Sequence, residues 1–422
     1  MKFETNSIHY GNIVRNSMPA LECTTRTQCV CECFVVSPAV LVSDEAVLSR
    51  LCEIQLLLAI IAFLDHLAKT IGVGMASPRY LLRFAYLGTR YRQVPVSFGG
   101  IQRQSTRPHT EHFTVQGAIE AALSQLGCLG DPVLVLASRT DTGVHASDSA
   151  AHVDLRPANP NQCFQPQHLA VGLNTVLTRH KHDIIIRDVL QVPSWFHARH
   201  LAQWRSYRYR VAVVKASALL DKEPLRLGGI RARLPLAELN RCHVVPPLNV
   251  DRVHEAMELL SGEHDFRSFK GVSRTPEEEE RSTVREVTEF RLRPAAPIDS
   301  DDPLYENIDL WEFHIRSRSF LYRQVRRMVS MALHAGLPDK LGDDPLSVVR
   351  CLLEKPSKNS WPGSITVVPA CGLYLMRVQY DPAHLDTNAE MPEEVAEMYE
   401  AKKKAPLQED GDEEDVEQAT AS

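Results

Sequence analysis

The segment Ser138–Ala146, which reads Ser-Arg-Thr-Asp-Thr-Gly-Val-His-Ala, has the residue types and spacing most able to do chemistry. It follows the apolar run Val133–Ala137, a predicted strand. A carboxylate at a strand end is held on a rigid element and faces the kind of loop region where ligands bind. An Asp-x-Gly turn alone is usually structural, because Asp caps turns readily. Asp141 therefore needs support from other segments, and Arg139 either pairs with it or reaches a phosphate or base.

Two further clusters combine aromatic and cationic groups: Phe196–Arg199 and Trp204–Arg210. On a strand, alternate residues share a face, so Tyr207 and Tyr209 lie opposite the arginines between and after them. Aromatic rings offer a stacking platform to nucleic-acid bases. Core packing is the competing interpretation for Tyr207.

The last cluster, Phe320–Met328, opens a long predicted helix that runs to Ala335. Arg323 and Arg327 share a face at i,i+4 spacing, and Arg326 lies beside them. These arginines either contact an anionic partner or remain solvated. For Arg326, bracing the end of the helix is a further interpretation.

The elements needed to position these residues fall into two halves. Short strands and helices alternate from Tyr80 to Val214, and a proline-bearing stretch, Lys222–Pro247, precedes a second set that ends at Tyr380. Because strands are both adjacent in sequence and separated by helices, we expect an α+β fold. The predicted organisation is an N-terminal extension (1–74), an N-terminal catalytic half (75–221), a C-terminal half (222–380) and an acidic, disordered tail (381–422).

Together, the four segments resemble the TruA family of tRNA pseudouridine synthases, and the resemblance runs from about Tyr80 to Tyr380. It implies the pseudouridine synthase fold, with two ferredoxin-like (RRM-like) halves around a central cleft. It also implies that Asp141 is the nucleophile, that Arg139 helps to flip the target uridine and that Arg326 pairs with the aspartate. By the same resemblance, the residues that contact the base and close its pocket are Tyr207 and Leu373. General contact with RNA is expected of the remaining arginines, Arg205, Arg323 and Arg327.

The resemblance implies an isomerase that acts on tRNA, or on mitochondrial transcripts, without a cofactor or metal. It further favours a homodimer and a mitochondrial location, while the length of the apolar run described below predicts no membrane association. The alternative is a non-catalytic RNA-binding or assembly factor on the same fold. A binder has no need of the carboxylate, so the intact set of Asp141, Arg139, Tyr207 and Arg326 favours the enzyme. Asp141-Thr142-Gly143 also matches the aspartic-protease triplet, but those enzymes need two copies, and the chain has one.

Charge is unevenly distributed along the chain. The net charge is -6, yet residues 75–380 hold 39 bases and 32 acids, while residues 381–422 hold 14 acids and 3 lysines. A basic centre suits a polyanionic partner, because Lys and Arg displace counterions from phosphates. The 10 cysteines show no secreted disulfide framework. The apolar run Ile54–Leu64 is shorter than the about 20 residues that span a bilayer.

Overall fold

The structure is a computed structural model, and it describes six stretches of the chain: residues 77–91, 114–157, 163–219, 234–272, 282–337 and 344–404. The predicted N-terminal extension therefore lies outside the described residues. The strands are β1 (Arg79–Tyr86), β2 (Cys128–Leu129), β3 (Val135–Leu136), β4 (His145–Asp154), β5 (Arg156–Pro157), β6 (Ile184–Val192), β7 (Trp204–Val214), β8 (His243–Val245), β9 (Gly262–Asp265), β10 (Val284–Pro294), β11 (Ile308–Ser317) and β12 (Leu373–Gln379). The α-helices are α2 (Val115–Ser124), α3 (Pro166–Arg179), α5 (Val250–Leu259), α7 (Gln324–Gly336), α8 (Pro345–Glu354) and α9 (Glu393–Lys404).

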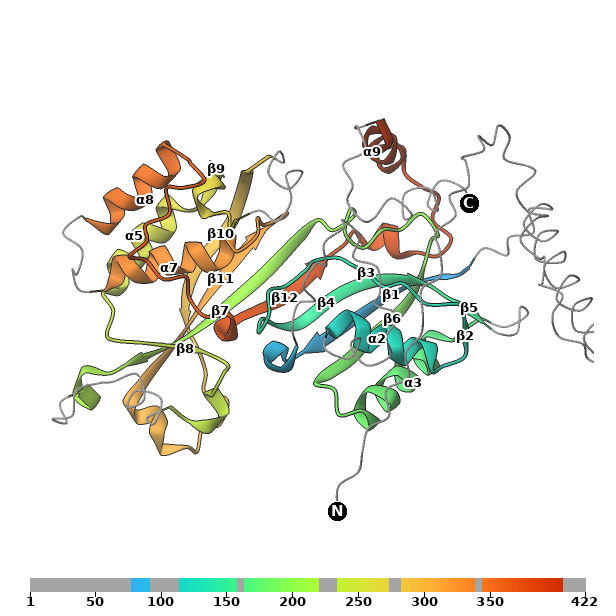
Figure 1. The fold of residues 1–422 in the computed structure, drawn as a ribbon, viewed down its shortest axis with the longest axis horizontal. Helices are drawn as coiled ribbons and strands as arrows, with labels where there is room; N and C mark the ends of the chain where they lie inside the picture. The colour runs from blue at the N-terminus through green and yellow to red at the C-terminus, as the bar shows by residue number, and fades with distance from the viewer. Residues whose placement is uncertain are drawn as a thin grey trace, which may run out of the picture. The chain divides into compact units, whose positions relative to one another are not determined.

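A ten-stranded mixed sheet runs through the described part of the chain, and β2 and β5 form a separate two-stranded sheet. Its strand order is β6-β1-β4-β12-β7-β11-β10-β9, with β3 beside β4 and β8 beside β7. The last strand, β12, lies between β4 and β7, parallel to β4 and antiparallel to β7. Figure 1 shows β12 passing between the early strands and the long strand β7. The predicted α+β class is confirmed, and β12 joins the strands of the two halves.

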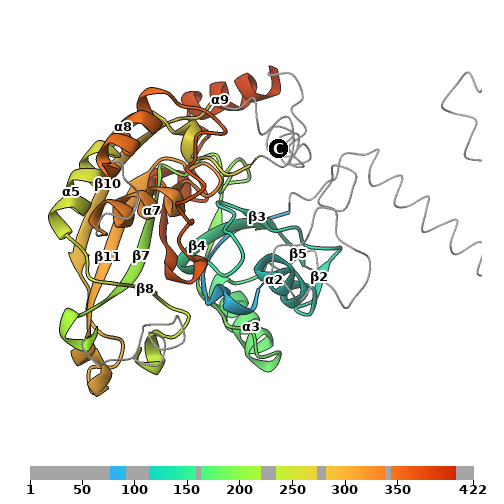
Figure 2. The ribbon, with the colours of Figure 1, turned by 60° about the vertical axis from the view of Figure 1, so that its left-hand side comes forward.

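Two groups of helices accompany the sheet. In the first half, α2 and α3 pack together and α3 packs on β6; in the second half, α5, α7 and α8 pack on one another beside β10 and η5 (Phe266–Phe269). Figure 2 shows α5, α7 and α8 gathered next to β10 and β11. Helix α7 buries most of its length, including Met328 and Met331, against this group. The helix that bears the arginine cluster is thus fixed by its apolar face.

The predicted helix Phe320–Ala335 begins later than expected. Helix α7 starts at Gln324, because Arg323 adopts a left-handed backbone conformation with φ 61°. The side-chain oxygen of Gln324 accepts a hydrogen bond from the Leu321 amide at 2.8 Å and closes this entry turn. The arginine cluster therefore begins in a turn, and Arg323 and Arg326 lie on different elements.

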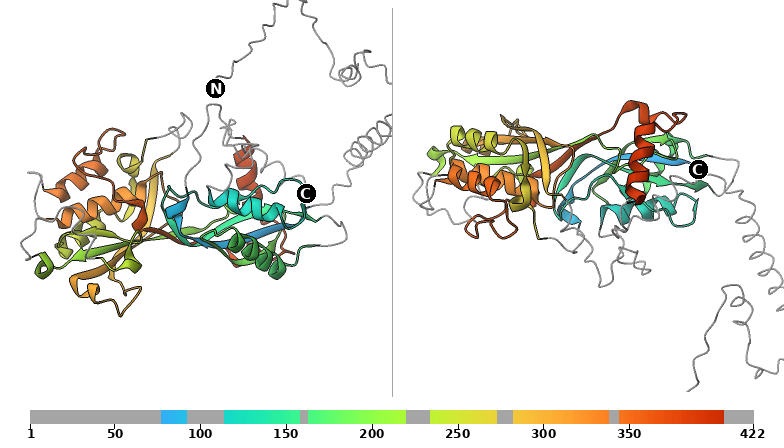
Figure 3. Two further views of the ribbon diagram at one scale, coloured as in Figure 1. Left: turned by 60° about the horizontal axis from the view of Figure 1, so that its bottom comes forward. Right: turned by 90° about the horizontal axis from the view of Figure 1, so that it is seen from above.

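The prediction of a disordered tail from residue 381 is wrong for residues 381–404. A short turn, η8 (Pro382–Leu385), is followed by α9, which lies alongside the first half of the chain in Figure 3. Val395 and Tyr399 are buried, and the Tyr399 hydroxyl donates to the Trp195 carbonyl at 2.8 Å. The acidic composition concealed this apolar pair at i,i+4 spacing. Residues 405–422 lie outside the described residues.

Gly88, just after β1, makes the closest backbone approach near the predicted catalytic loop. A Cβ at this position would lie 1.8 Å from the Val144 carbonyl oxygen. We expect Gly88→Ala to lower the free energy of unfolding by about 3 kcal/mol, because backbone must move to admit the methyl group. Urea denaturation measures this, with Gly363→Ala as the control, since a Cβ there meets nothing within 4 Å. Equal stability of the two variants would contradict this packing.

Candidate active site

The loop between β3 and β4 presents Asp141 to the first turn of α7. The Asp141 main-chain carbonyl accepts a hydrogen bond from the Val144 amide at 3.1 Å, and Gly143 takes the positive φ of 84° that this turn requires. The Arg326 guanidinium donates to Asp141 Oδ2 at 2.8 Å. The Asp141 side chain is 17% exposed and that of Arg326 is 15% exposed, so the carboxylate is paired but still reachable from solvent.

Arg326 is held at both ends of its guanidinium. Its Nε donates to the Val368 carbonyl at 2.9 Å, while its Nη1 bonds Asp141. Ser330, one turn along α7, donates to the Arg326 carbonyl and accepts from the Val368 amide at 2.9 Å. The segment before β12 and helix α7 thus jointly orient the cation that faces the carboxylate. This is the ion pair that the sequence resemblance implies.

Tyr207 lies on β7 beside the same loop. Its hydroxyl shares a hydrogen bond of 3.1 Å with Ser138 Oγ, and Phe320 meets its ring edge-on at a centroid distance of 5.3 Å. Burial raises the pKa of Tyr207, and the nearby carboxylate of Asp141 raises it further. The phenol therefore stays protonated at neutral pH and can donate a hydrogen bond. Tyr207 and Asp141 form one site even though 66 positions separate them in the chain.

His145, inside the motif, has a structural role. Its Nδ1 accepts from the Gly88 amide at 3.1 Å, and its Nε2 faces the carbonyls of Asn240 and Cys371, each at 3.1 Å. The proton therefore resides on Nε2. Burial lowers the pKa of His145, which keeps the ring neutral. This agrees with the sequence interpretation that His145 packs and bonds rather than acting as a base.

Arg139 and Arg323 are exposed near the site. Among the residues that the structure describes, none forms an ion pair with Arg139. Arg323 lies over the ring of Tyr322, with its guanidinium carbon 5.1 Å from the ring centroid. Both guanidinium groups are available to a phosphate or base, and their predicted RNA roles remain predictions.

The prediction that Arg205 contacts RNA does not fit its location. Only 8% of Arg205 is exposed. Its guanidinium donates to the carbonyls of Arg318 at 2.6 Å, Ala137 at 2.7 Å and Arg199 at 3.1 Å. Arg205 thus ties the end of β3 to two other segments directly below the catalytic loop. Sequence cannot distinguish such an internal cation from a surface one, because both carry the same side chain.

Arg327 likewise points inward. Its Nη1 donates to the carbonyls of Ser268 at 3.0 Å and Lys270 at 2.5 Å, and its guanidinium lies over the Trp361 ring at 4.8 Å. The prediction of RNA contact by Arg327 is therefore replaced by a role in fixing η5 to α7. Leu373 is the first residue of β12. It is the cross-strand partner of Tyr209 on β7, and its side chain is buried.

Removal of the Arg205 guanidinium should destabilise the protein rather than weaken RNA binding alone. We expect Arg205→Ala to lower the free energy of unfolding by about 2–4 kcal/mol, because one buried and two part-buried carbonyls lose their donor. Arg318→Ala is the control, since that side chain is exposed and should change stability by less than about 0.5 kcal/mol. Denaturant unfolding measures both. Weaker tRNA binding by Arg205→Ala at unchanged stability would restore the surface interpretation.

Tyr86, Ser138 and Thr140 lie at the site but were not predicted from the sequence. The Tyr86 hydroxyl shares a hydrogen bond of 2.8 Å with Thr140 Oγ1, which parallels the bond between Tyr207 and Ser138. The signal was available in part, because Ser138 and Thr140 alternate with Arg139 and Asp141. Their partners depend on strand pairing, which one sequence does not reveal.

Membrane-spanning helices and metal-binding clusters are both absent from the residues that the structure describes. No helix among the described ranges is long and apolar enough to cross a membrane. Nor do those ranges hold a group of three or more His, Cys, Asp or Glu side chains that could bind a metal ion. The candidate site is built from one carboxylate, arginines and hydroxyls.

The structure places the arginine-paired carboxylate of Asp141 beside the buried Tyr207 on a mixed α+β sheet. Residues 256–381 match the family described as tRNA pseudouridine synthase. The chain is 34% identical over 314 residues to tRNA pseudouridine synthase-like 1 of Homo sapiens, covering 73% of this chain and 91% of that protein. It is 32% identical over 310 residues to the Xenopus laevis protein of the same name (73% and 93%) and 32% identical over 302 residues to tRNA pseudouridine synthase A of Thermus thermophilus (72% and 96%). The chain belongs to the TruA family of tRNA pseudouridine synthases.

Proposed function

We propose that Asp141 is the nucleophile with which this pseudouridine synthase isomerises uridine in tRNA. The observation that carries the proposal is the Asp141 carboxylate, held at 2.8 Å by Arg326 and still partly exposed beside Tyr207. A nucleophilic carboxylate must be ionised and reachable. A paired cation favours the ionised form, and incomplete burial leaves room for a substrate.

The reaction is an internal exchange of bonds. The carboxylate attacks either ribose C1′ or uracil C6, the N1–C1′ bond breaks, and the base turns and rejoins C1′ through C5. The bond between the carboxylate and the nucleotide breaks again on either route, which regenerates the free carboxylate. C5 then loses its proton and N1 gains one, so the product is an isomer and no electron acceptor is needed. The proton lost from C5 provides a direct measure of turnover.

The neighbouring groups suit a flipped nucleotide. Removing a base from its stack costs a few kcal/mol, which new contacts must offset. We propose that the exposed Arg139 takes the vacated space and that the Tyr207 ring contacts the uracil, with Leu373 in the floor of the pocket. Arg323 is proposed as a contact to the RNA backbone, where guanidinium and phosphate attract each other.

The test of activity is release of tritium from tRNA labelled at uridine C5. Wild-type protein should release tritium above the background of a no-protein control, and mapped product should contain pseudouridine. Binding of tRNA without tritium release from any tRNA pool would support the alternative, a non-catalytic RNA-binding factor. A salt titration of tRNA binding measures the contacts to the RNA backbone. Each phosphate that the protein neutralises releases counterions, so the affinity falls more steeply with ionic strength as the number of such contacts rises.

We further propose that the sheet consists of two ferredoxin-like halves around a central cleft. The strand orders β6-β1-β4-β3 and β12-β7-β11-β10 support this, because each gives the order 4-1-3-2 of a β-α-β-β-α-β unit. A homodimer and a mitochondrial location are proposed on the sequence resemblance. Sedimentation of the purified protein and imaging of a tagged chain test these two points.

A further inference from the structure

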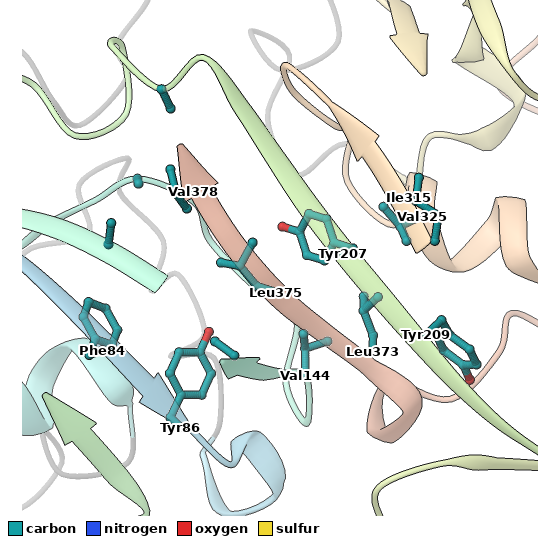
Figure 4. Packing of buried hydrophobic residues seen from close by; sticks show 14 of the residues in the cluster. Phe84, Tyr86, Val144, Tyr207, Tyr209, Ile315, Val325, Leu373, Leu375 and Val378 are labelled. Carbon is teal, nitrogen blue, oxygen red and sulfur yellow. The ribbon is translucent and has the colours of Figure 1, made fainter. Parts of the chain in front are cut away.

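Six buried side chains form one row across the central sheet. Each is the cross-strand partner of the next, and partners in register point to the same face. In order from β1 to β10, they are Tyr86, Ala146, Leu375, Tyr207, Ile315 and Phe290. Figure 4 shows Leu375 between the rings of Tyr86 and Tyr207. The row thus places two tyrosines on one face, separated by two apolar residues.

The two tyrosines are the polar members of this row. Ala146 and Leu375 are shorter than tyrosine, so the two phenol hydroxyls reach beyond the apolar floor. Each meets a hydroxyl of the loop that carries Asp141: Tyr86 meets Thr140 at 2.8 Å, and Tyr207 meets Ser138 at 3.1 Å. The loop is therefore attached to the sheet at alternate residues.

Arg139 and Asp141 alternate along the loop with Ser138 and Thr140, the two residues that bond the tyrosines. With Ser138 and Thr140 directed to the sheet, Arg139 is exposed and Asp141 faces Arg326. We propose that Tyr86 is a positioning residue for catalysis, which holds the Asp141 carboxylate at its attack position through the Thr140 hydroxyl. This inference rests on the proposed role of Asp141 and adds a residue whose hydroxyl bonds Thr140, the neighbour of Asp141.

Burial strengthens the attachment. Tyr86 is 7% exposed, and burial raises its pKa far above neutrality, so its hydroxyl keeps the proton. Loss of the phenol oxygen would leave the Thr140 hydroxyl without this partner in a part-buried position. The loop would then gain freedom at the residue next to Asp141. A misplacement of about 1 Å at a reacting group can reduce rate by about 10²-fold.

The experiment compares Tyr86→Phe, Thr140→Val and the double variant in steady-state tritium release, measured over a range of tRNA concentrations. We expect each single variant to lower kcat by about 10- to 100-fold while KM for tRNA stays within about threefold. The double variant should be no slower than either single variant, because both single variants remove the same hydrogen bond, the one between Tyr86 and Thr140. Thr140→Ser keeps the hydroxyl and should keep most of the rate. If Tyr86→Phe fails to fold, Thr140→Val and Thr140→Ser still make the comparison.

Tyr80→Phe is the matched control. Tyr80 lies on the same strand, is 0% exposed, and donates its hydroxyl to the Phe164 carbonyl at 2.9 Å, outside the candidate site. It should lose similar stability and retain kcat. Equal loss of kcat in Tyr80→Phe and Tyr86→Phe, or unchanged kcat in Tyr86→Phe, would overturn the inference. Because Asp141→Asn is measured in parallel, a failure limited to Tyr86 is distinguishable from a failure of the proposed nucleophile.

Discussion

Asp141→Asn should abolish pseudouridine formation while the protein still folds and binds tRNA. We expect turnover to fall by roughly 10³-fold or more, because an amide cannot replace the carboxylate as nucleophile. That is a loss of about 4 kcal/mol of transition-state stabilisation. Asparagine has nearly the same shape, so the hydrogen bond from Arg326 can persist in weaker form. Tritium release measures turnover, and filter binding measures the dissociation constant of tRNA.

Asp154→Asn is the matched control for this prediction. Asp154 also forms a close ion pair, with Arg79 Nε and Nη2 each at 2.7 Å, but it lies at the far end of β4. Its change should reduce stability and leave turnover per folded molecule intact. Activity retained in Asp141→Asn at more than about a tenth of the wild-type rate would exclude a covalent role for that carboxylate.

Removal of Arg326 should have the second-largest effect. We expect Arg326→Ala to lower kcat by about 10²- to 10³-fold, because the partly buried carboxylate loses its cation and the segment at Val368 loses its donor. Arg326→Lys should restore only part of the rate. A single ammonium cannot reproduce the fork that bonds Asp141 and the Val368 carbonyl together.

Arg350→Ala serves as the control, since Arg350 is an exposed arginine on α8. It should change neither kcat nor KM by more than about twofold. For Arg326→Ala, a loss seen only in KM would instead indicate that Arg326 binds RNA in the ground state. The kcat and KM values for uridine-containing tRNA therefore separate a role beside the carboxylate from a role in binding.

Asp141 and Arg326 were both singled out from the sequence, and the structure brings their side chains together. Asp141 lies in a motif where every neighbour has an assignable position, and Arg326 lies near the start of a helix with a clear apolar face. The pairing of Asp141 with Arg326 was implied by the resemblance to the TruA family and not by either local pattern. The strand that carries Tyr207 was equally readable, because its alternating aromatic and cationic residues fit a sheet.

The predictions that failed depended on long-range packing. Arg205 is an internal clamp because the carbonyls of Ala137, Arg199 and Arg318 converge on it from three segments. No local pattern distinguishes that environment from solvent. The hydroxyl pair of Tyr86 and Thr140 is a similar case, since it depends on the register of β1 with β4.

The two remaining errors concern where elements begin and end, which composition and periodicity predicted incorrectly. Acidic composition predicted disorder after residue 380, yet Val395 and Tyr399 suffice to pack α9. Helical periodicity carried the predicted helix back to Phe320, whereas the left-handed backbone at Arg323 delays its start to Gln324. One or two specific residues decided each boundary.

The most direct test of the nucleophile is to trap it. We would incubate the protein with tRNA that carries 5-fluorouridine, whose fluorine cannot leave C5 as a proton does, then quench, digest and analyse the peptides by tandem mass spectrometry. The predicted result is a nucleotide adduct on Asp141, absent from Asp141→Asn. An adduct on another residue, or one that forms equally in Asp141→Asn, would contradict the assignment.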